Sequence, residues 1–291
     1  MNYQKPTIVA GAMIQAGIDK TQLSIGDLLV RGILSGAILG FGTTLALTAT
    51  IQTGLPIVGA VIFPACFVIV VLMGLELVTG SFAVLPMAYL DGKIGFNRML
   101  ANLTVVFIGN LLGGLLYAVL FWLSITNFGQ QDGGAIAALI VKTAEAKTLG
   151  YGQYGAYGWS TAFTKGILCN WMVTTGVVLG MASSSSSGKI LGAWLPVFIF
   201  FGQGFEHAVV NMFVIPAGIF SGAAVSWGDW WVLNQIPVTL GNFVGGAVFT
   251  AAALYFTFGK KKQVADVKVN TDTIVPSRFA QPQEVGEPTS F

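Results

Sequence analysis

Six apolar stretches limit what this chain can fold into. Each is long enough to cross a lipid bilayer, for which a helix needs about 20 mostly apolar residues. The chain as a whole has too few charges for a water-exposed surface of ordinary composition, because 54% of its residues are hydrophobic and only 9% are charged, against roughly 25% in soluble domains. The expected fold is an all-α integral membrane protein with six transmembrane helices. The stretches are Leu28–Thr50, Ile57–Leu90, Leu103–Ser124, Thr161–Ala182, Ile190–Phe220 and Ile236–Phe258.

The second and fifth stretches carry a further constraint. Both are too long for one straight crossing, and each is interrupted by a glycine and a charged residue, Glu76 in the second and Glu206 in the fifth. Such interruptions are typical of transporter helices that break inside the membrane. We therefore expect the second and fifth helices to be broken.

The chain also contains an internal repeat. The segment GLELVTGSFAVLPMA from Gly74 recurs as GFEHAVVNMFVIPAG from Gly204. Two shorter pairs, RGIL with KGIL and GNLLGG with GNFVGG, recur in the same order at offsets of 134 and 132 residues. Each half has three crossings, so the second half must enter the membrane in the opposite orientation. The prediction is an inverted 3+3 repeat, about residues 28–126 and 161–258, whose broken helices meet near the bilayer midplane.

Lysine and arginine residues predict the orientation. Six crossings put both termini on one side, which carries most of the positive charges; the other side has only Lys142 and Lys147, in a long loop over residues 125–160. Because cytoplasmic loops are enriched in positive residues, both termini are expected in the cytoplasm of a cell-membrane protein. The predicted parts are a cytoplasmic N-terminal segment (1–27), a six-helix transmembrane domain (28–258) and a disordered cytoplasmic tail (259–291).

Four charged residues lie inside the predicted spans, where charges are costly and usually paired. The repeat relates Arg31 to Lys165 and Glu76 to Glu206. Two cations and two acids related by a pseudo-two-fold axis can neutralise each other, so we interpret them as buried ion pairs that brace the broken helices. A direct part in conduction is the alternative. The sequence leaves open which cation meets which acid.

His207 is the only histidine of the chain, and the repeat aligns it with Leu77. The symmetry of the fold therefore does not demand it. An ordinary buried core histidine is the alternative, but the position beside a helix break favours a residue of the substrate pathway. Imidazole titrates near neutral pH and can donate a hydrogen bond in either form. It could hold a permeating anion or hand it a proton.

Other hydrogen-bond donors fall near the breaks. Thr79 lies beside the first break, and Asn170 and Asn211 carry amide groups in the fourth and fifth stretches. Half-helix N-termini also expose backbone N–H groups, which favour anions. Donors in apolar surroundings suit a small anion better than a cation, which would want carboxylates or carbonyls. Phe63 and Phe200 could form apolar collars around the anion, with plain packing as the alternative for each.

Several functional classes find no support in the sequence. One histidine and two separated cysteines do not make a usual zinc site, and no P-loop for ATP is present. A formal net charge of +2 is too small to suggest a nucleic-acid partner. We expect neither an enzyme nor a bound metal or cofactor.

Four motifs around the predicted breaks carry a family resemblance: KGILCNWMV, GFEHAVVNMFVIP, ELVTGS and IPVTLGNFVGG. Residues 10–258 resemble the formate/nitrite transporter family through them. The resemblance implies a homopentamer of aquaporin-like six-helix protomers, each with its own pore. It also implies residue roles: His207 as the central histidine, Thr79 as the threonine of the broken second helix, Asn170 as the pore asparagine, and Phe63 and Phe200 as the aromatic constriction.

One residue departs from the family pattern. Where a phenylalanine often precedes the threonine in formate channels, this chain has Val78. The constriction is expected to be wider for that reason, which leaves nitrite, hydrosulfide and lactate-like anions open beside formate.

The predicted function is passage of small monovalent weak-acid anions, with formate first, by a passive or proton-linked route. A neutral-solute channel of aquaporin type is the rival within transport, but the chain has no paired Asn-Pro-Ala motifs. A membrane scaffold without a pore is the rival from another class. A scaffold would not need a lone histidine at a helix break.

Overall fold

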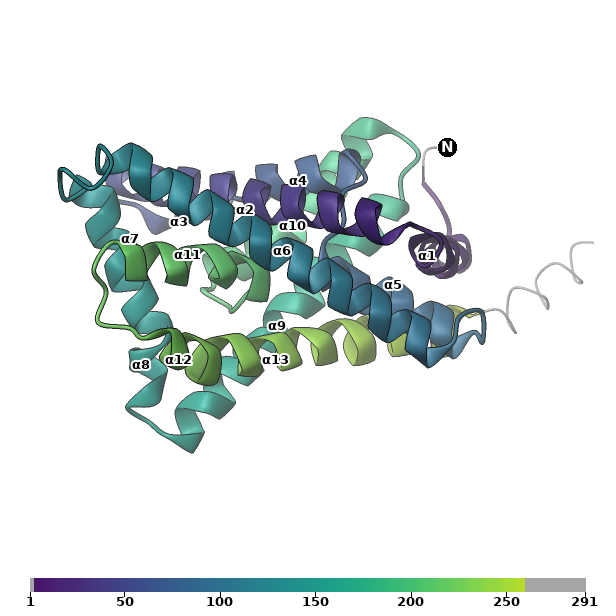
Figure 1. Cartoon of the computed structure of the whole chain (residues 1–291). Coiled ribbons are helices and arrows are strands. Elements are labelled where there is room, and N and C mark those ends of the chain that lie inside the picture. The colour runs from purple at the N-terminus through teal and green to yellow at the C-terminus, as the bar shows by residue number, and fades with distance from the viewer. Residues whose placement is uncertain (1–2, 260–291) are drawn as a thin grey trace, which may run out of the picture.

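The fold consists of packed helices (Figure 1). The computed structural model describes residues 3–259, and within this range there is no β-strand, only an isolated bridge between Tyr3 and Ser183. The helices are α1 (Pro6–Lys20), α2 (Ile25–Thr53), α3 (Pro56–Ile62), α4 (Pro64–Leu72), α5 (Val78–Leu90), α6 (Phe96–Ile125), α7 (Gly134–Lys147), α8 (Leu149–Gly152), α9 (Ala156–Met181), α10 (Ser186–Gly202), α11 (Ala208–Phe220), α12 (Trp227–Asp229), α13 (Ile236–Gly246) and α14 (Ala253–Phe258), with π-helical stretches η1 (Trp230–Gln235) and η2 (Ala247–Ala252).

Six crossings can be traced along the chain. Four are continuous and apolar enough to span a bilayer: α2, α6, α9 and the run from α12 to α14. The other two consist of shorter apolar helices, α3 and α4 followed by α5, and α10 followed by α11. The predicted six-helix architecture with broken second and fifth helices is confirmed. Large apolar side chains such as Phe41 and Leu191 stay exposed on this surface, as lipid-facing residues do in an integral membrane protein.

The two breaks share one local geometry. Just after α4 and α10, a glycine adopts the left-handed backbone conformation, with φ of +63° at Gly74 and +65° at Gly204. Glycine is favoured there because it has no Cβ to clash. In both breaks the next residue donates its N–H to the carbonyl five positions earlier, which is the Schellman arrangement that closes a helix. The chain then runs extended through Leu77 or His207 and starts the second half-helix.

One asparagine holds each break open, Asn110 in the first half and Asn242 in the second. Asn110 Oδ1 accepts a hydrogen bond from the Val78 N–H (2.9 Å), and Asn242 Oδ1 accepts one from the Ala208 N–H (2.8 Å). Each amide nitrogen also donates to the backbone carbonyl of the glutamate in the same break, at 2.9 Å. The two asparagines stand at equivalent positions of the GNLLGG and GNFVGG motifs, so the same brace is built twice, as expected for the repeat.

Two peripheral helices extend this equivalence. α1 precedes α2 and packs on α5, while α7 precedes α9 and packs on α11. They lie near opposite ends of the molecule in Figure 1. The segment 125–160, expected to be a loop, therefore holds α7 and α8. α7 buries only Ala137, Ile140 and Ala144, a stripe too narrow to stand out in a mixed sequence. Apart from Gly259, the predicted tail lies outside the described residues.

Candidate functional site

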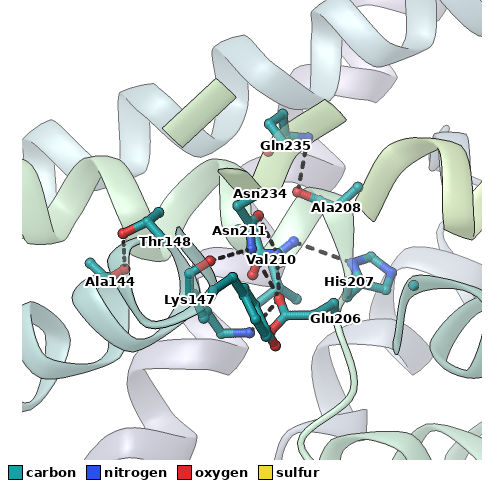
Figure 2. Close-up of polar contacts among 12 residues, drawn as sticks. Ala144, Lys147, Thr148, Glu206, His207, Ala208, Val210, Asn211, Asn234 and Gln235 are labelled. Carbon is teal, nitrogen blue, oxygen red and sulfur yellow. Dashed lines mark hydrogen bonds and ion pairs between the residues drawn. The ribbon is translucent and has the colours of Figure 1, made fainter. Parts of the chain in front are cut away.

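His207 lies at the N-terminus of α11, where its backbone and side chain both act as the helix cap. The ring Nδ1 accepts a hydrogen bond from the Val210 N–H at 3.2 Å (Figure 2). The ring Nε2 lies 3.1 Å from Thr79 Oγ1, which belongs to the first turn of α5. Neutral imidazole has one donor and one acceptor nitrogen. Since Nδ1 accepts, the proton sits on Nε2 and is donated to Thr79. The two half-helices thus meet through this bond.

Aromatic rings cover one side of the histidine. The Phe200 ring stacks on the His207 ring with centroids 5.7 Å apart and an interplanar angle of 17°. Phe63 contacts Phe200 edge to face at 6.1 Å. Phe63 is 1% exposed and Phe200 2%, so an ion beside the imidazole would lie in apolar surroundings. Val78 is buried too, and its N–H is already bonded to an asparagine side chain.

Two cavities approach the histidine–threonine bond from different elements. The α1-side cavity, about 330 Å³, is lined by four charged residues and by neighbouring apolar residues and glycines that include Leu77 and Gly80; the charged residues are Asp19, Lys20, Arg31 and Glu76. The α7-side cavity, about 190 Å³, is lined by Thr43, Thr143, Lys147, His207 and neighbouring apolar residues that include Phe200 and Val210. Leu77 and His207 are repeat-related, so each cavity ends at the cap residue of one half-helix. Thr79 and Val78 line neither cavity.

The buried acids have other partners than the predicted ones. Glu76 Oε2 pairs with Lys20 Nζ at 2.7 Å, and Glu206 Oε2 pairs with Lys147 Nζ at 2.8 Å. The expected pairing with the cations of α2 and α9 is wrong. Each partner is the last residue of a peripheral helix, α1 or α7, which docks against the half-helix that follows the acid. These two lysines are 127 residues apart, close to the repeat offset, and that spacing is the signal that could have identified them.

The two cations of the predicted pairs, Arg31 and Lys165, form no salt bridge within residues 3–259. Lys165 Nζ lies 5.6 Å from the centroid of the Tyr151 ring, an arrangement that gives a cation–π contact. It borders a separate surface hollow with Tyr157 and three hydroxyl residues. Arg31 is half-buried and faces the α1-side cavity.

Glu206 is held by a polar network that the sequence did not predict (Figure 2). Besides Lys147, its carboxylate accepts hydrogen bonds from Tyr151 Oη (2.8 Å), Asn211 Nδ2 (2.8 Å) and Asn234 Nδ2 (3.4 Å). Burial, and then the nearby carboxylate, raise the pKa of the Tyr151 phenol, so the phenol stays protonated and donates. Four donors around one acid favour its ionised form.

The side-chain amide groups of Asn170 and Asn211 donate their hydrogen bonds to acceptors within the protein. Asn170 Nδ2 donates to the carbonyls of Thr79 (3.0 Å) and Asn242 (2.7 Å). Asn211 Nδ2 donates to Glu206 and to Asn234 Oδ1 (2.8 Å). The predicted role of these amides as donors to an anion is therefore not what their contacts favour. They position the threonine and the acid that flank the histidine.

Comparison with known proteins agrees with this geometry. Residues 7–256 match the family model described as formate/nitrite transporter. A probable formate transporter of Methanothermobacter thermautotrophicus is 35% identical over 89% of this chain and 99% of its own length. A formate channel of Bacillus thuringiensis is 32% identical over 90% of this chain and 98% of its own length.

Solved structures show the same fold. A channel described as an FNT family ion channel superposes with a TM-score of 0.74 at 25% identity, covering 86% of this chain and 99% of the other. One described as a pentameric formate channel with formate bound gives a TM-score of 0.66 at 26% identity, covering 81% and 98%. The broken helices of this chain meet through the His207–Thr79 bond. On the family match and the similar relatives, the chain belongs to the formate/nitrite transporter family.

Proposed function

We propose that this protein conducts small monovalent weak-acid anions across the cell membrane, with formate as its principal substrate. The observation that carries the proposal is the bond from His207 Nε2–H to Thr79 Oγ1, which leaves the Thr79 hydroxyl hydrogen as the donor to an anion between the two half-helices, next to a cavity that His207 lines. An anion that has shed water needs such a donor, because burying an unpaired charge in apolar surroundings is strongly unfavourable. Relatives named as formate channels or transporters support the choice of formate.

The route follows from the two cavities. An anion enters either cavity, passes the rings of Phe63 and Phe200 or the side chain of Leu77, and meets the donor pair of His207 and Thr79. The apolar rings limit passage to ions that can lose most of their hydration, which favours monovalent anions over multiply charged ones. Nitrite, hydrosulfide and lactate-type anions remain further candidate substrates, because Val78 is smaller than the phenylalanine that often precedes this threonine in formate channels.

The assembly and orientation belong to the same proposal. The related structure described as pentameric supports a homopentamer with one pore in each protomer. The excess of lysine and arginine on the side that carries both termini supports a cytoplasmic location for them. Nothing in this route requires bond making or breaking in a substrate, so we place the protein among transporters and not among enzymes.

Uptake by proteoliposomes tests the proposal. Purified protein is reconstituted and uptake of formate, nitrite, lactate and hydrosulfide is followed over a pH series, with protein-free liposomes as the control. Formate uptake well above the control is the expected result. Uptake of another of these anions but not formate would correct the substrate. No uptake of any would favour the non-conducting scaffold and sink the proposal.

A further inference from the structure

Arg31 is the unpaired cation of the α1-side cavity. The cavity also holds two acids, Glu76 and Asp19, but each is already bonded. Glu76 pairs with Lys20 at 2.7 Å, and Asp19 Oδ1 accepts a hydrogen bond from Gln15 Nε2, also at 2.7 Å. In the part of the chain that the structure describes, no carboxylate forms a salt bridge with Arg31. Its guanidinium donors are therefore available to a ligand in the cavity.

The other half of the repeat has no counterpart to this arrangement. Lys165, the repeat partner of Arg31, lies over the ring of Tyr151 and does not line the α7-side cavity. The one charged side chain that lines that cavity among the described residues is Lys147, which is paired with Glu206 at 2.8 Å. Among the described residues that line the two cavities, the one cation without a salt bridge therefore belongs to the α1-side cavity.

We propose that Arg31 binds planar, two-oxygen monovalent anions in the α1-side cavity, so that carboxylates and nitrite are selected before they reach His207. This inference rests on the proposed function and names the substrate class of its pore. Guanidinium is planar and presents paired N–H donors that match two oxygens of one anion. Formate, nitrite and lactate all offer two such oxygens. Chloride and hydrosulfide have a single charged centre and bond to one donor direction at a time.

The position of Arg31 suits capture followed by release. The residue is half-buried, so its charge is screened less than on a fully exposed surface but can still be reached from water. The same cavity extends to Leu77 and Gly80 at the start of α5, next to Thr79. An anion bound at Arg31 therefore has a continuous space leading to the half-helix junction. Lys20 does not replace Arg31 in this role, because the Lys20 ammonium already donates to the Glu76 carboxylate.

Binding is measured without transport, in detergent-solubilised protein carrying His207→Phe to remove the pore donor. ¹³C-formate is titrated into each protein, and its NMR line width is followed. The proteins are this parent and the same parent carrying Arg31→Lys, Arg31→Gln or, as the matched control, Lys165→Gln. Arg31→Gln is expected to raise the half-saturating formate concentration roughly tenfold, the effect of losing one strong charge-assisted contact. Arg31→Lys should weaken formate binding but retain broadening of ³⁵Cl-chloride. Lys165→Gln should match the parent. Equal formate binding in parent and Arg31→Gln, or equal loss in Lys165→Gln, would overturn the inference.

Transport separates this inference from the proposed function. With the native His207 restored, Arg31→Gln should raise the half-saturating formate concentration when formate is presented to the α1-side cavity, and leave it unchanged from the opposite side. Arg31-dependent binding in a protein that transports no formate would reject the proposed function and keep the binding site. Formate transport with binding that ignores Arg31 would do the reverse.

Discussion

At the scale of single residues, His207 is fixed in one protonation pattern by its own helix. The ring Nδ1 accepts the Val210 N–H, so a second ring proton would have to displace this cap bond. A ring that hands a proton to an anion must first carry two protons. The local geometry therefore favours holding the anion by hydrogen bonding, through the Thr79 hydroxyl that the His207 Nε2–H orients, over protonating it. Phe200, stacked on the ring, limits its rotation into other arrangements.

Two substitutions of His207 test this view. His207→Phe removes the donor and is expected to abolish formate uptake in proteoliposomes while the oligomer remains intact on size-exclusion chromatography. His207→Asn keeps a donor and a capping oxygen but cannot titrate. It is expected to retain part of the uptake with the wild-type pH profile. Uptake by His207→Asn that has lost its dependence on low pH would show that protonation is needed, and unchanged uptake in both variants would make His207 an ordinary core residue.

The sequence predicted the centre of the site better than its surroundings. His207 was identifiable because the repeat places Leu77 opposite it, and Thr79 because it flanks the other break. The partners of the two acids were not identifiable, since Lys20 and Lys147 lie outside the apolar stretches and reach the acids only after α1 and α7 dock. Tertiary contacts of this kind leave no local pattern in hydropathy, and only the repeat offset hints at them.

At the scale of helices, the two halves of the repeat share part of the hydrogen bonding around the buried acid but differ in the residue that bridges it to an asparagine. Asn102 and Asn234 each donate to the carbonyl of the last residue of the peripheral helix, at 2.8 Å. In the second half, Asn211 bridges the acid and Asn234 Oδ1. In the first half the repeat puts Ser81 in the place of Asn211, and a serine side chain is too short to bridge. Ser81 Oγ and Asn102 Oδ1 are accordingly buried without a hydrogen-bond partner among the described residues.

Replacing Ser81 by Asn and, separately, Asn211 by Ser should change the free energy of unfolding in opposite directions. Ser81→Asn supplies the missing bridge and is expected to raise stability by about 1 kcal/mol, the net value of a hydrogen bond. Asn211→Ser removes the bridge and leaves buried groups unpaired, which is expected to destabilise by about 1–3 kcal/mol. Thermal unfolding of the detergent-solubilised protein measures both. A lower midpoint for Ser81→Asn would mean that the packing around Ser81 and Asn102 has no space for the larger side chain.

The same difference between halves predicts unequal roles for the two acids. Glu206 has four donors, whereas Glu76 has Lys20 and faces the α1-side cavity. Glu206→Gln should lower the free energy of unfolding by about 3 kcal/mol. This is the low end of the range for breaking a buried ion pair, because the Lys147 side chain is 20% exposed to solvent. Glu76→Gln should cost less.

Asp19→Asn is the control for the two glutamate variants, since Asp19 bonds only a nearby glutamine side chain on α1 in the described structure. Midpoints of thermal unfolding in detergent rank the three variants. Equal midpoints for Glu206→Gln and Glu76→Gln would show that the additional donors of the second half do not strengthen its ion pair.

At the scale of the whole molecule, contacts between distant segments place both ends of the described chain together. The Gln4 N–H bonds the carbonyl of Ala182 at 2.8 Å, next to the connection between α9 and α10. α1 also contacts α14, the last described helix. The start of the chain, the connection near residue 183 and the end of α14 therefore lie on one side. The connection after α6 lies one crossing away from that side, at the other end of the molecule.

This arrangement can be tested with two exposed positions. Single cysteines at Gln130, after α6, and at Ser187, in the first turn of α10, are expected to react with a membrane-impermeant thiol reagent from opposite sides. In intact cells only the Gln130 variant should be labelled, because the positive-inside rule puts Ser187 in the cytoplasm. The native Cys66 and Cys169 are both buried, so the unmodified chain serves as the unlabelled control. In inside-out vesicles the pattern should invert. One crossing, α9, separates Gln130 from Ser187, so labelling of both variants from the same side would contradict the inverted orientation of the two halves. Labelling of the Ser187 variant alone in intact cells would keep the inverted repeat but reverse the proposed orientation of the whole protein in the membrane.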